Sequence, residues 1–212
     1  MVVTANNRVL VLAPHTDDGE LGCGGTISRM VEEGREVYYA AFSTAAESVP
    51  PPFPSDILEK EVREGTKVLG IPAANLLVYK YKVRHLPHMR QEILEELVRM
   101  KREIDPGTVF LPSAQDLHQD HQTVHIEGLR AFKTVTVLGY ELPWNNLSFD
   151  YRHFCVLTRA HVETKIAALR CYQSQQHRPY TQEEFIWSWA RTRGGQIMVE
   201  YAEAFDVLRW VR

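Results

Sequence analysis

Short runs of apolar residues alternate with longer amphipathic stretches along almost all of the 212 residues. The short runs have the length and composition of buried strands, and the longer stretches repeat apolar residues at helical spacing. The predicted strands are 8–13, 36–42, 76–79, 108–111, 134–140, 153–157 and 204–208. The predicted helices are 20–34, 55–70, 87–104, 121–132, 159–173 and 182–193.

This alternation predicts an α/β fold, a Rossmann-like three-layer αβα sandwich in which helices cover both faces of a mainly parallel sheet. The chain length suits one large domain, and we find no repeat or low-complexity segment. We therefore predict a single domain over residues 1–212. The proline-rich segment SVPPPFPSD (48–56) is predicted to be a loop, because proline blocks both helix and central strand.

The composition changes the picture only by exclusion. A net charge of −3 without a Lys/Arg block argues against general nucleic-acid binding. The apolar stretch 9–14 is too short for a signal segment or a membrane span. The three cysteines are widely spaced and form no CxxC motif, which is typical of reduced thiols. We therefore expect a cytoplasmic protein with no membrane span.

Two polar stretches follow two of the predicted strands directly. APHTDDGELGCGGT (13–26) comes at the end of strand 8–13, and LPSAQDLHQDH (111–121) comes at the end of strand 108–111. Functional loops of such folds gather at the carboxyl ends of the strands. Both stretches are therefore expected to meet at one rim of the sheet.

The glycines of the first stretch raise the possibility of a phosphate cradle. A dinucleotide fingerprint places its glycines immediately after the strand, whereas here they come several residues later, at 22, 24 and 25. The carboxylates of Asp17 and Asp18 would repel a phosphate, and no Lys-Ser/Thr pair follows. The sequence therefore disfavours nucleotide binding, and we expect these glycines to let the helix pack closely on the sheet.

A metal site accounts better for the polar residues. His15 and Asp18 are spaced to bind one cation from a tight turn, and zinc accepts both imidazole and carboxylate ligands. Asp17 is free to act as a base, and one histidine of the HQDH sequence at 118–121 can complete three protein ligands. Asp120 can orient a neighbouring imidazole. The alternative, helix-capping carboxylates with solvated histidines, suits either motif alone better than it suits both together.

With both motifs, the chain resembles the PIG-L/LmbE family of zinc-dependent de-N-acetylases. The family's first motif is A-H-P-D-D-x-E-L-G-x-G-G-T; here proline precedes the histidine and Thr16 follows it, so we expect an altered turn with the ligand spacing intact. The family's second motif, H-x-D-H, is present as HQDH. LEKEVREGTKVLGI, KIAALRCYQSQ and YAEAF also match, so the resemblance covers nearly the whole chain.

The resemblance implies a role for each motif residue. Zn²⁺ would be held by His15, Asp18 and His121. Asp17 would be the general base, and His118, held by Asp120, would stabilise the oxyanion or protonate the leaving amine. Amide hydrolysis creates negative charge on oxygen, which a cationic His118 could oppose.

The resemblance also implies a substrate and an assembly. Arg63 would reach substrate hydroxyls, although a solvated helix arginine is an equal alternative, and Tyr201 would lie near the pocket. The loop around Trp144 and the segment after Ser48 are expected to shape that pocket. The expected activity removes an N-acetyl or similar small acyl group from an amino sugar, such as a GlcNAc-containing metabolite or glycoconjugate. Hydrolysis of another amide or ester, or sugar binding without catalysis, are the alternatives; a trimer or hexamer is expected by family analogy.

Overall fold

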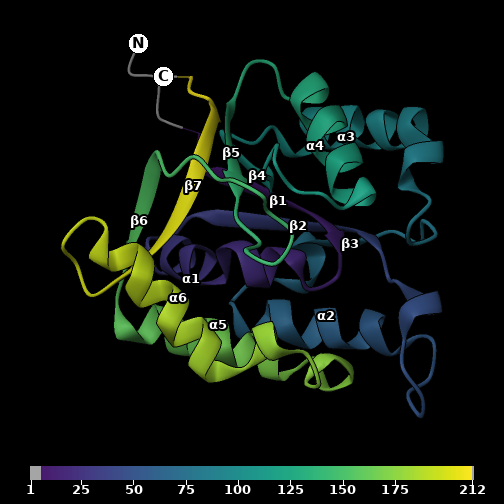
Figure 1. Ribbon diagram of the computed structural model, residues 1–212. Helices are drawn as coiled ribbons and strands as arrows, with labels where there is room; N and C mark the ends of the chain where they lie inside the picture. The colour runs from purple at the N-terminus through teal and green to yellow at the C-terminus, as the bar shows by residue number, and fades with distance from the viewer. Residues whose placement is uncertain (1–5, 212) are drawn as a thin grey trace.

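The computed structural model describes residues 6–211, in which a seven-stranded sheet lies between two sets of helices (Figure 1). The strands are β1 (Arg8–His15), β2 (Glu36–Ser43), β3 (Leu76–Val78), β4 (Thr108–Pro112), β5 (Thr136–Tyr140), β6 (His153–Leu157) and β7 (Tyr201–Arg209). The helices are α1 (Asp18–Glu32), α2 (Ile57–Val68), α3 (Arg90–Ile104), α4 (Gln119–Ala131), α5 (Arg159–Arg170) and α6 (Glu183–Gly195). Short 3₁₀ turns span Ala46–Ser48, Ala73–Asn75, Leu86–Met89, Gln173–Gln175 and Pro179–Thr181.

The strand order is β3-β2-β1-β4-β5-β7-β6, and the first five strands are parallel. β7 runs antiparallel to both β5 and β6. The α/β fold with a mainly parallel sheet is thus confirmed. β1 lies in the interior of the sheet, and its side chains alternate between the two faces: Val9 and Val11 enter one hydrophobic cluster, whereas Leu10 and Leu12 enter the other.

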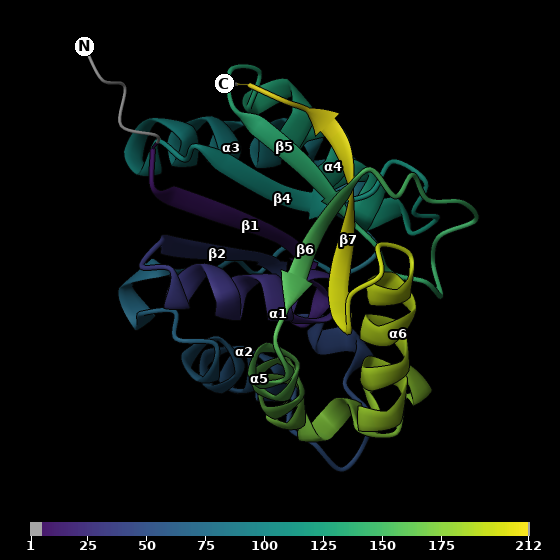
Figure 2. The ribbon, with the colours of Figure 1, turned by 90° about the vertical axis from the view of Figure 1, so that its left-hand side faces the viewer.

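The helices cover both faces of the sheet. α3 and α4 pack together on one side, and α1, α2, α5 and α6 lie on the other, with α1 nearest the strands (Figure 2). The helix predicted from residue 20 begins two residues earlier, so Asp18 lies in its first turn. The strand predicted at 204–208 begins at Tyr201, because its first residues pair with β6. No helix within residues 6–211 is long and apolar enough to span a membrane.

Helix α1 is kinked at Cys23, where the backbone leaves the helical region (φ −146°, ψ 22°). A buried ion pair fills the break: Lys165 Nζ lies 2.7 Å from Glu203 Oε1. Lys165 donates to the Leu21 carbonyl at 2.6 Å, and Glu203 accepts the N–H groups of Gly25 and of the next residue at 3.1 and 2.7 Å. The pair therefore satisfies backbone groups that the kink leaves without helical partners.

The glycines of α1 permit a close approach to the sheet, as predicted. A Cβ atom added at Gly19 would lie 2.5 Å from the Tyr39 ring, and one added at Gly22 would lie 2.4 Å from the Tyr140 ring. Both rings are fully buried and have little room to move. The glycine cluster is therefore a packing feature between α1 and the strands behind it.

We expect Glu203→Gln to lower the free energy of unfolding by about 3–5 kcal/mol, because the Lys165 ammonium would stay buried without its counter-charge. Urea denaturation measures the change. Glu64→Gln is the matched control: it removes an exposed pair with Lys67 and is expected to cost less than about 1 kcal/mol. Equal effects of the two substitutions would contradict a role for the buried pair in holding the kink.

Candidate active site

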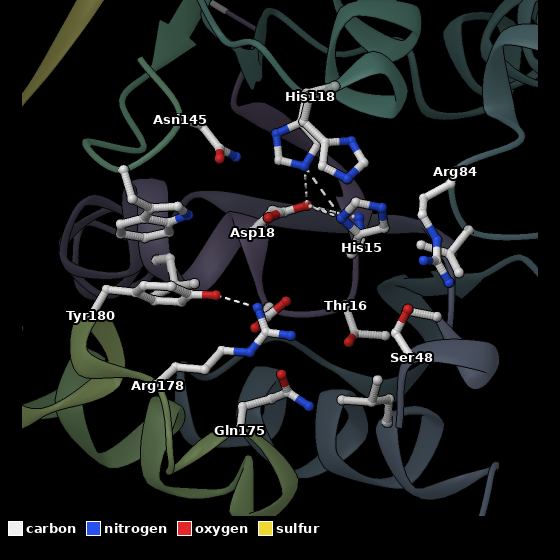
Figure 3. A pocket seen from close by; sticks show the side chains of 17 residues that line it. His15, Thr16, Asp18, Ser48, Arg84, His118, Asn145, Gln175, Arg178 and Tyr180 are labelled. Carbon is white, nitrogen blue, oxygen red and sulfur yellow. Dashed lines mark hydrogen bonds and ion pairs between the residues drawn. The ribbon is translucent and has the colours of Figure 1, made fainter. Parts of the chain in front are cut away.

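The two sequence motifs lie side by side at the carboxyl ends of neighbouring strands. His15 is the last residue of β1, and Asp18 is the first residue of α1. His118 immediately precedes α4, and His121 lies in the first turn of that helix, which follows β4. Figure 3 shows the imidazoles grouped around the Asp18 carboxylate. The parallel pairing of β1 with β4 brings together residues that are about a hundred positions apart along the chain.

Three predicted ligand atoms form a nearly equilateral triangle. His15 Nδ1 lies 3.2 Å from Asp18 Oδ2 and 3.2 Å from His121 Nε2, and the latter two atoms are 3.3 Å apart. Ligand atoms at about 2.0–2.1 Å from a tetrahedral zinc ion lie about 3.3 Å from one another. The donor set and its spacing therefore fit Zn²⁺.

The outer nitrogen of each imidazole faces a carboxylate. His15 Nε2 lies 3.0 Å from Asp120 Oδ2, and His121 Nδ1 lies 2.8 Å from Asp116 Oδ2. Because a carboxylate accepts the proton of the outer nitrogen, the inner nitrogen of each neutral ring presents its lone pair to the shared centre. The sequence analysis missed Asp116, which also accepts the His118 N–H at 2.8 Å. Its only signal was an acidic residue between the fourth strand and the HQDH motif.

His118 offers a second way to complete a metal site. His15, His118 and His121 each present one nitrogen, and these atoms lie within 4.8 Å of one another. However, His118 Nδ1 accepts the Asp120 backbone N–H at 3.1 Å, so the neutral ring carries its proton on Nε2. The set with Asp18 is therefore better suited to a cation. The Asp120 carboxylate contacts His15, not His118 as the resemblance implied.

The electrostatics separate the two adjacent aspartates. Burial alone would raise the pKa of Asp18, but the imidazoles of His121 and His15 hold it well below its usual range. Burial and the charge of Asp18 raise the pKa of Asp17 to about 6. Burial, together with His121 and His15, lowers the pKa of His118 to about 4, so this imidazole is neutral near pH 7 and not cationic as expected. Asp17 thus has the properties of a base, and Asp18 those of a ligand.

Two buried tyrosines hold the turn that carries these residues. The Thr16 carbonyl accepts hydrogen bonds from the hydroxyls of Tyr39 at 2.9 Å and Tyr172 at 2.8 Å. Both hydroxyls also contact the carboxyl group of Glu20, whose pKa burial raises to about 8. The turn at Thr16, where the family motif has proline, is therefore fixed by contacts from β2 and from the segment after α5.

A cavity of about 240 Å³ opens beside the candidate metal centre. Asp17 lines it, together with the polar side chains of Ser48, Asn145 and Gln175. Trp144 also lines it and stacks on Tyr180, with ring centroids 3.8 Å apart. The loop around Trp144 thus lines the cavity, as expected from the sequence, whereas of the segment expected after Ser48 only Ser48 itself lies on the cavity wall.

The two predicted substrate residues lie outside this cavity. Arg63 projects from α2 and pairs with Glu59 at 3.0 Å, with half of its side chain exposed. Tyr201 is buried, and its ring packs against Trp187 with centroids 5.2 Å apart. Neither Arg63 nor Tyr201 lines the cavity. The wall instead includes Arg178, which the sequence analysis did not identify.

Comparisons with known proteins identify the family of this chain. A family model described as PIG-L, GlcNAc-PI de-N-acetylase, matches residues 10–132, more than half of the chain. The chain belongs to the PIG-L family, a family of deacetylases. An Escherichia coli K12 protein described as an uncharacterized deacetylase, YaiS, is 29% identical over 182 residues, which cover 82% of this chain and 96% of that protein.

Two further similar proteins are described as deacetylases of an acetylated sugar, diacetylchitobiose. A diacetylchitobiose deacetylase from Thermococcus kodakarensis is 27% identical over 190 residues, which cover 79% of this chain and 70% of that protein. The structure of N,N'-diacetylchitobiose deacetylase from Pyrococcus horikoshii matches with a TM-score of 0.81 at 21% identity, covering 96% of this chain and 84% of that one. The latter likeness shows that the fold is shared.

The two possible ligand sets predict different effects on zinc affinity. We expect Asp18→Asn to weaken zinc binding by more than about 100-fold, beyond the usual effect of losing an outer hydrogen-bond partner. His118→Gln is expected to change the affinity by less than about 10-fold, because this residue lies outside the triangle. Competition with a chromophoric chelator measures both. A greater loss in His118→Gln than in Asp18→Asn would favour the set of three histidines.

Proposed function

We propose that this protein is a zinc-dependent hydrolase that removes an N-acetyl or similar small acyl group from an amino-sugar-containing metabolite or glycoconjugate. The observation that carries the proposal is the triangle of His15, Asp18 and His121, with Asp17 beside it on the cavity wall. Membership of the PIG-L family supports the deacetylase activity, and the Thermococcus relative supports a sugar substrate. We propose that the chain acts as a single domain, within a cytoplasmic homo-oligomer.

The reaction consumes one water and one amide and yields a carboxylate and an amine. When bound, Zn²⁺ supplies a Lewis acid and lowers the pKa of water. Asp17 is ionised at neutral pH, since its pKa is about 6, and it accepts a proton from the attacking water. The same carboxyl group can return this proton to the departing amine nitrogen. A pKa close to the working pH suits both steps.

His118 donates a hydrogen bond to the acyl oxygen as negative charge develops on it. Its Nδ1 is occupied by the Asp120 N–H, so Nε2 carries the proton that a developing oxyanion can accept as a hydrogen bond. Its ring stands edge-on to His15, with centroids 4.8 Å apart, which places it beside the metal centre. A neutral donor of this kind stabilises the negative charge without a change of protonation.

The cavity suits a substrate unit of modest size. Its volume of about 240 Å³ lies just below the range of about 300–1,000 Å³ for sites that bury drug-sized ligands. The stacked rings of Trp144 and Tyr180 offer an apolar surface of the kind on which a sugar face packs, and Ser48, Asn145 and Gln175 offer hydrogen bonds. These features support a single sugar ring next to the acyl group.

We expect Asp17→Asn to retain one zinc per chain and to lose about 10²–10⁴-fold in kcat, because the amide cannot accept the proton of water. Metal analysis and acetate release from N-acetylglucosamine and diacetylchitobiose measure the two properties. Asp150→Asn, an exposed site, is the matched control and keeps full activity.

Full activity in a zinc-loaded Asp17→Asn variant would overturn the assignment of the base. Hydrolysis of other amides or esters without acetate release from the sugars would support a different acyl substrate. Sugar binding without turnover of any of these compounds would support a non-catalytic role.

A further inference from the structure

Two arginines reach the cavity from segments that are distant in the sequence. Arg84 lies between β3 and the turn Leu86–Met89, and Arg178 lies between the turns Gln173–Gln175 and Pro179–Thr181; both line the cavity wall (Figure 3). Within residues 6–211, neither guanidinium forms an ion pair with a carboxylate, whereas arginines on the outer surface, such as Arg29 and Arg159, do. Both guanidiniums therefore face the cavity without a direct ion-pair partner among residues 6–211, although Arg178 also interacts electrostatically with Asp17 and Asp18.

Arg178 is half-buried and incompletely hydrogen-bonded. One of its terminal nitrogens donates to the Tyr180 hydroxyl, which fixes the side chain against the ring that stacks on Trp144. Its Nε is buried and has no hydrogen-bond partner among the described residues. The hydroxyl of Thr16, which is fully buried and lines the same cavity, also lacks one. Buried polar groups without partners are rare and costly in folded proteins, and a polar ligand in the cavity would supply a partner for these two.

Arg84 is held at the cavity by a strained backbone. Its φ of +66° lies in the left-handed region, which non-glycine residues rarely adopt. The Arg84 N–H donates to Asp120 Oδ2 at 2.6 Å, and the same carboxylate orients His15 and accepts the Leu86 N–H at 3.1 Å. Backbone strain of this kind persists where the surroundings fix it, and it gathers at functional sites. The backbone of Arg84, from which the exposed guanidinium extends, is thus bound to the carboxylate that also contacts His15.

The cavity lining carries charged groups of both signs. The carboxylates that line it, Asp17 and Asp18, both belong to the metal centre. The rest of its lining consists of the imidazoles, neutral polar side chains, apolar side chains and the two guanidiniums. Side chains such as Asn145 and Gln175 suffice to hydrogen-bond the neutral hydroxyls of a sugar. A guanidinium instead presents two parallel N–H donors, which match the oxygens of a carboxylate or a phosphate.

We propose that Arg84 and Arg178 bind an anionic group of the substrate, a carboxylate or a phosphate, so that the preferred substrate is an acidic N-acyl amino sugar. This inference rests on the proposed function and narrows its substrate class. The acyl group would lie at the metal centre, and the anionic group would lie against the arginines. The hydrolysis would not alter the anionic group.

The test compares kcat/KM of the zinc-loaded protein for three related sugars: neutral N-acetylglucosamine, its 6-phosphate, and N-acetylmuramic acid, which carries a carboxylate. We expect an anionic sugar to be preferred over the neutral one by about 10- to 100-fold, the usual range for a charge-assisted hydrogen bond. The phosphate and carboxylate arms show which anion is recognised.

The variants Arg84→Gln and Arg178→Gln are expected to lower the ratio of kcat/KM values for anionic and neutral sugars towards one. Arg178→Lys, which keeps the charge but loses the fork, is expected to retain part of the preference. Arg102→Gln is the matched control, because Arg102 lies on the outer surface and should leave the ratio unchanged. A ratio near one in the wild-type protein, or a ratio unaffected by both glutamine variants, would overturn the inference while acetate release still supports the proposed function.

If no sugar is hydrolysed, a binding measurement tests the anion site separately from the proposed hydrolase activity. Quenching of tryptophan fluorescence on titration with each sugar uses Trp144, which lines the cavity beside Tyr180. Tighter binding of an anionic sugar that is lost in Arg178→Gln would support the anion site even if the proposed hydrolysis fails. Equal binding of neutral and anionic sugars would reject it.

Discussion

The buried ion pair between Lys165 and Glu203 holds the break in α1, the helix that begins within the first candidate metal-site motif. It joins α5 and β7 to the break in α1, and each of its charges satisfies backbone groups on one side of that break. The first turn of α1, which carries Asp18, is therefore aligned separately from the rest of the helix. A charged pair so far from solvent is stable because every partner is present at once.

A second layer of carboxylates orients the imidazoles of the candidate metal centre. Asp116 and Asp120 each contact one imidazole and at least one backbone N–H group. Each therefore fixes a tautomer and anchors a loop with the same side chain. Because Asp120 also holds the backbone of Arg84, the geometry of the metal centre and that of the cavity wall are mechanically connected.

Local sequence patterns were sufficient for the elements and for the placement of the two motifs. Apolar runs locate the strands, and the rule that loops gather at strand ends brings His15 and His121 together. The kink in α1 was not predictable, because it depends on Lys165 and Glu203, which lie far along the chain. Arg84 and Arg178 were missed for the same reason: an arginine in a loop has no local signature that distinguishes a cavity wall from solvent. Arg63 is the opposite case: its sequence matches a family motif, yet its side chain does not reach the cavity.

The cavity is assembled from two unequal parts of the sequence. The candidate metal ligands, the base and His118 all lie within residues 10–132, the segment that matches the family model. Trp144, Asn145, Gln175, Arg178 and Tyr180 come after it. Apart from Ser48 and Arg84, the polar and aromatic residues proposed for recognition thus lie outside the stretch that carries the proposed chemistry, and the two meet only in the folded chain. Exchange of the loop around Trp144 and of residues 175–180 between relatives, with Lys165, Tyr172 and Glu203 kept, would alter what the protein recognises while the supports of the proposed reaction centre stay in place. This gives the fold a simple route to new substrates.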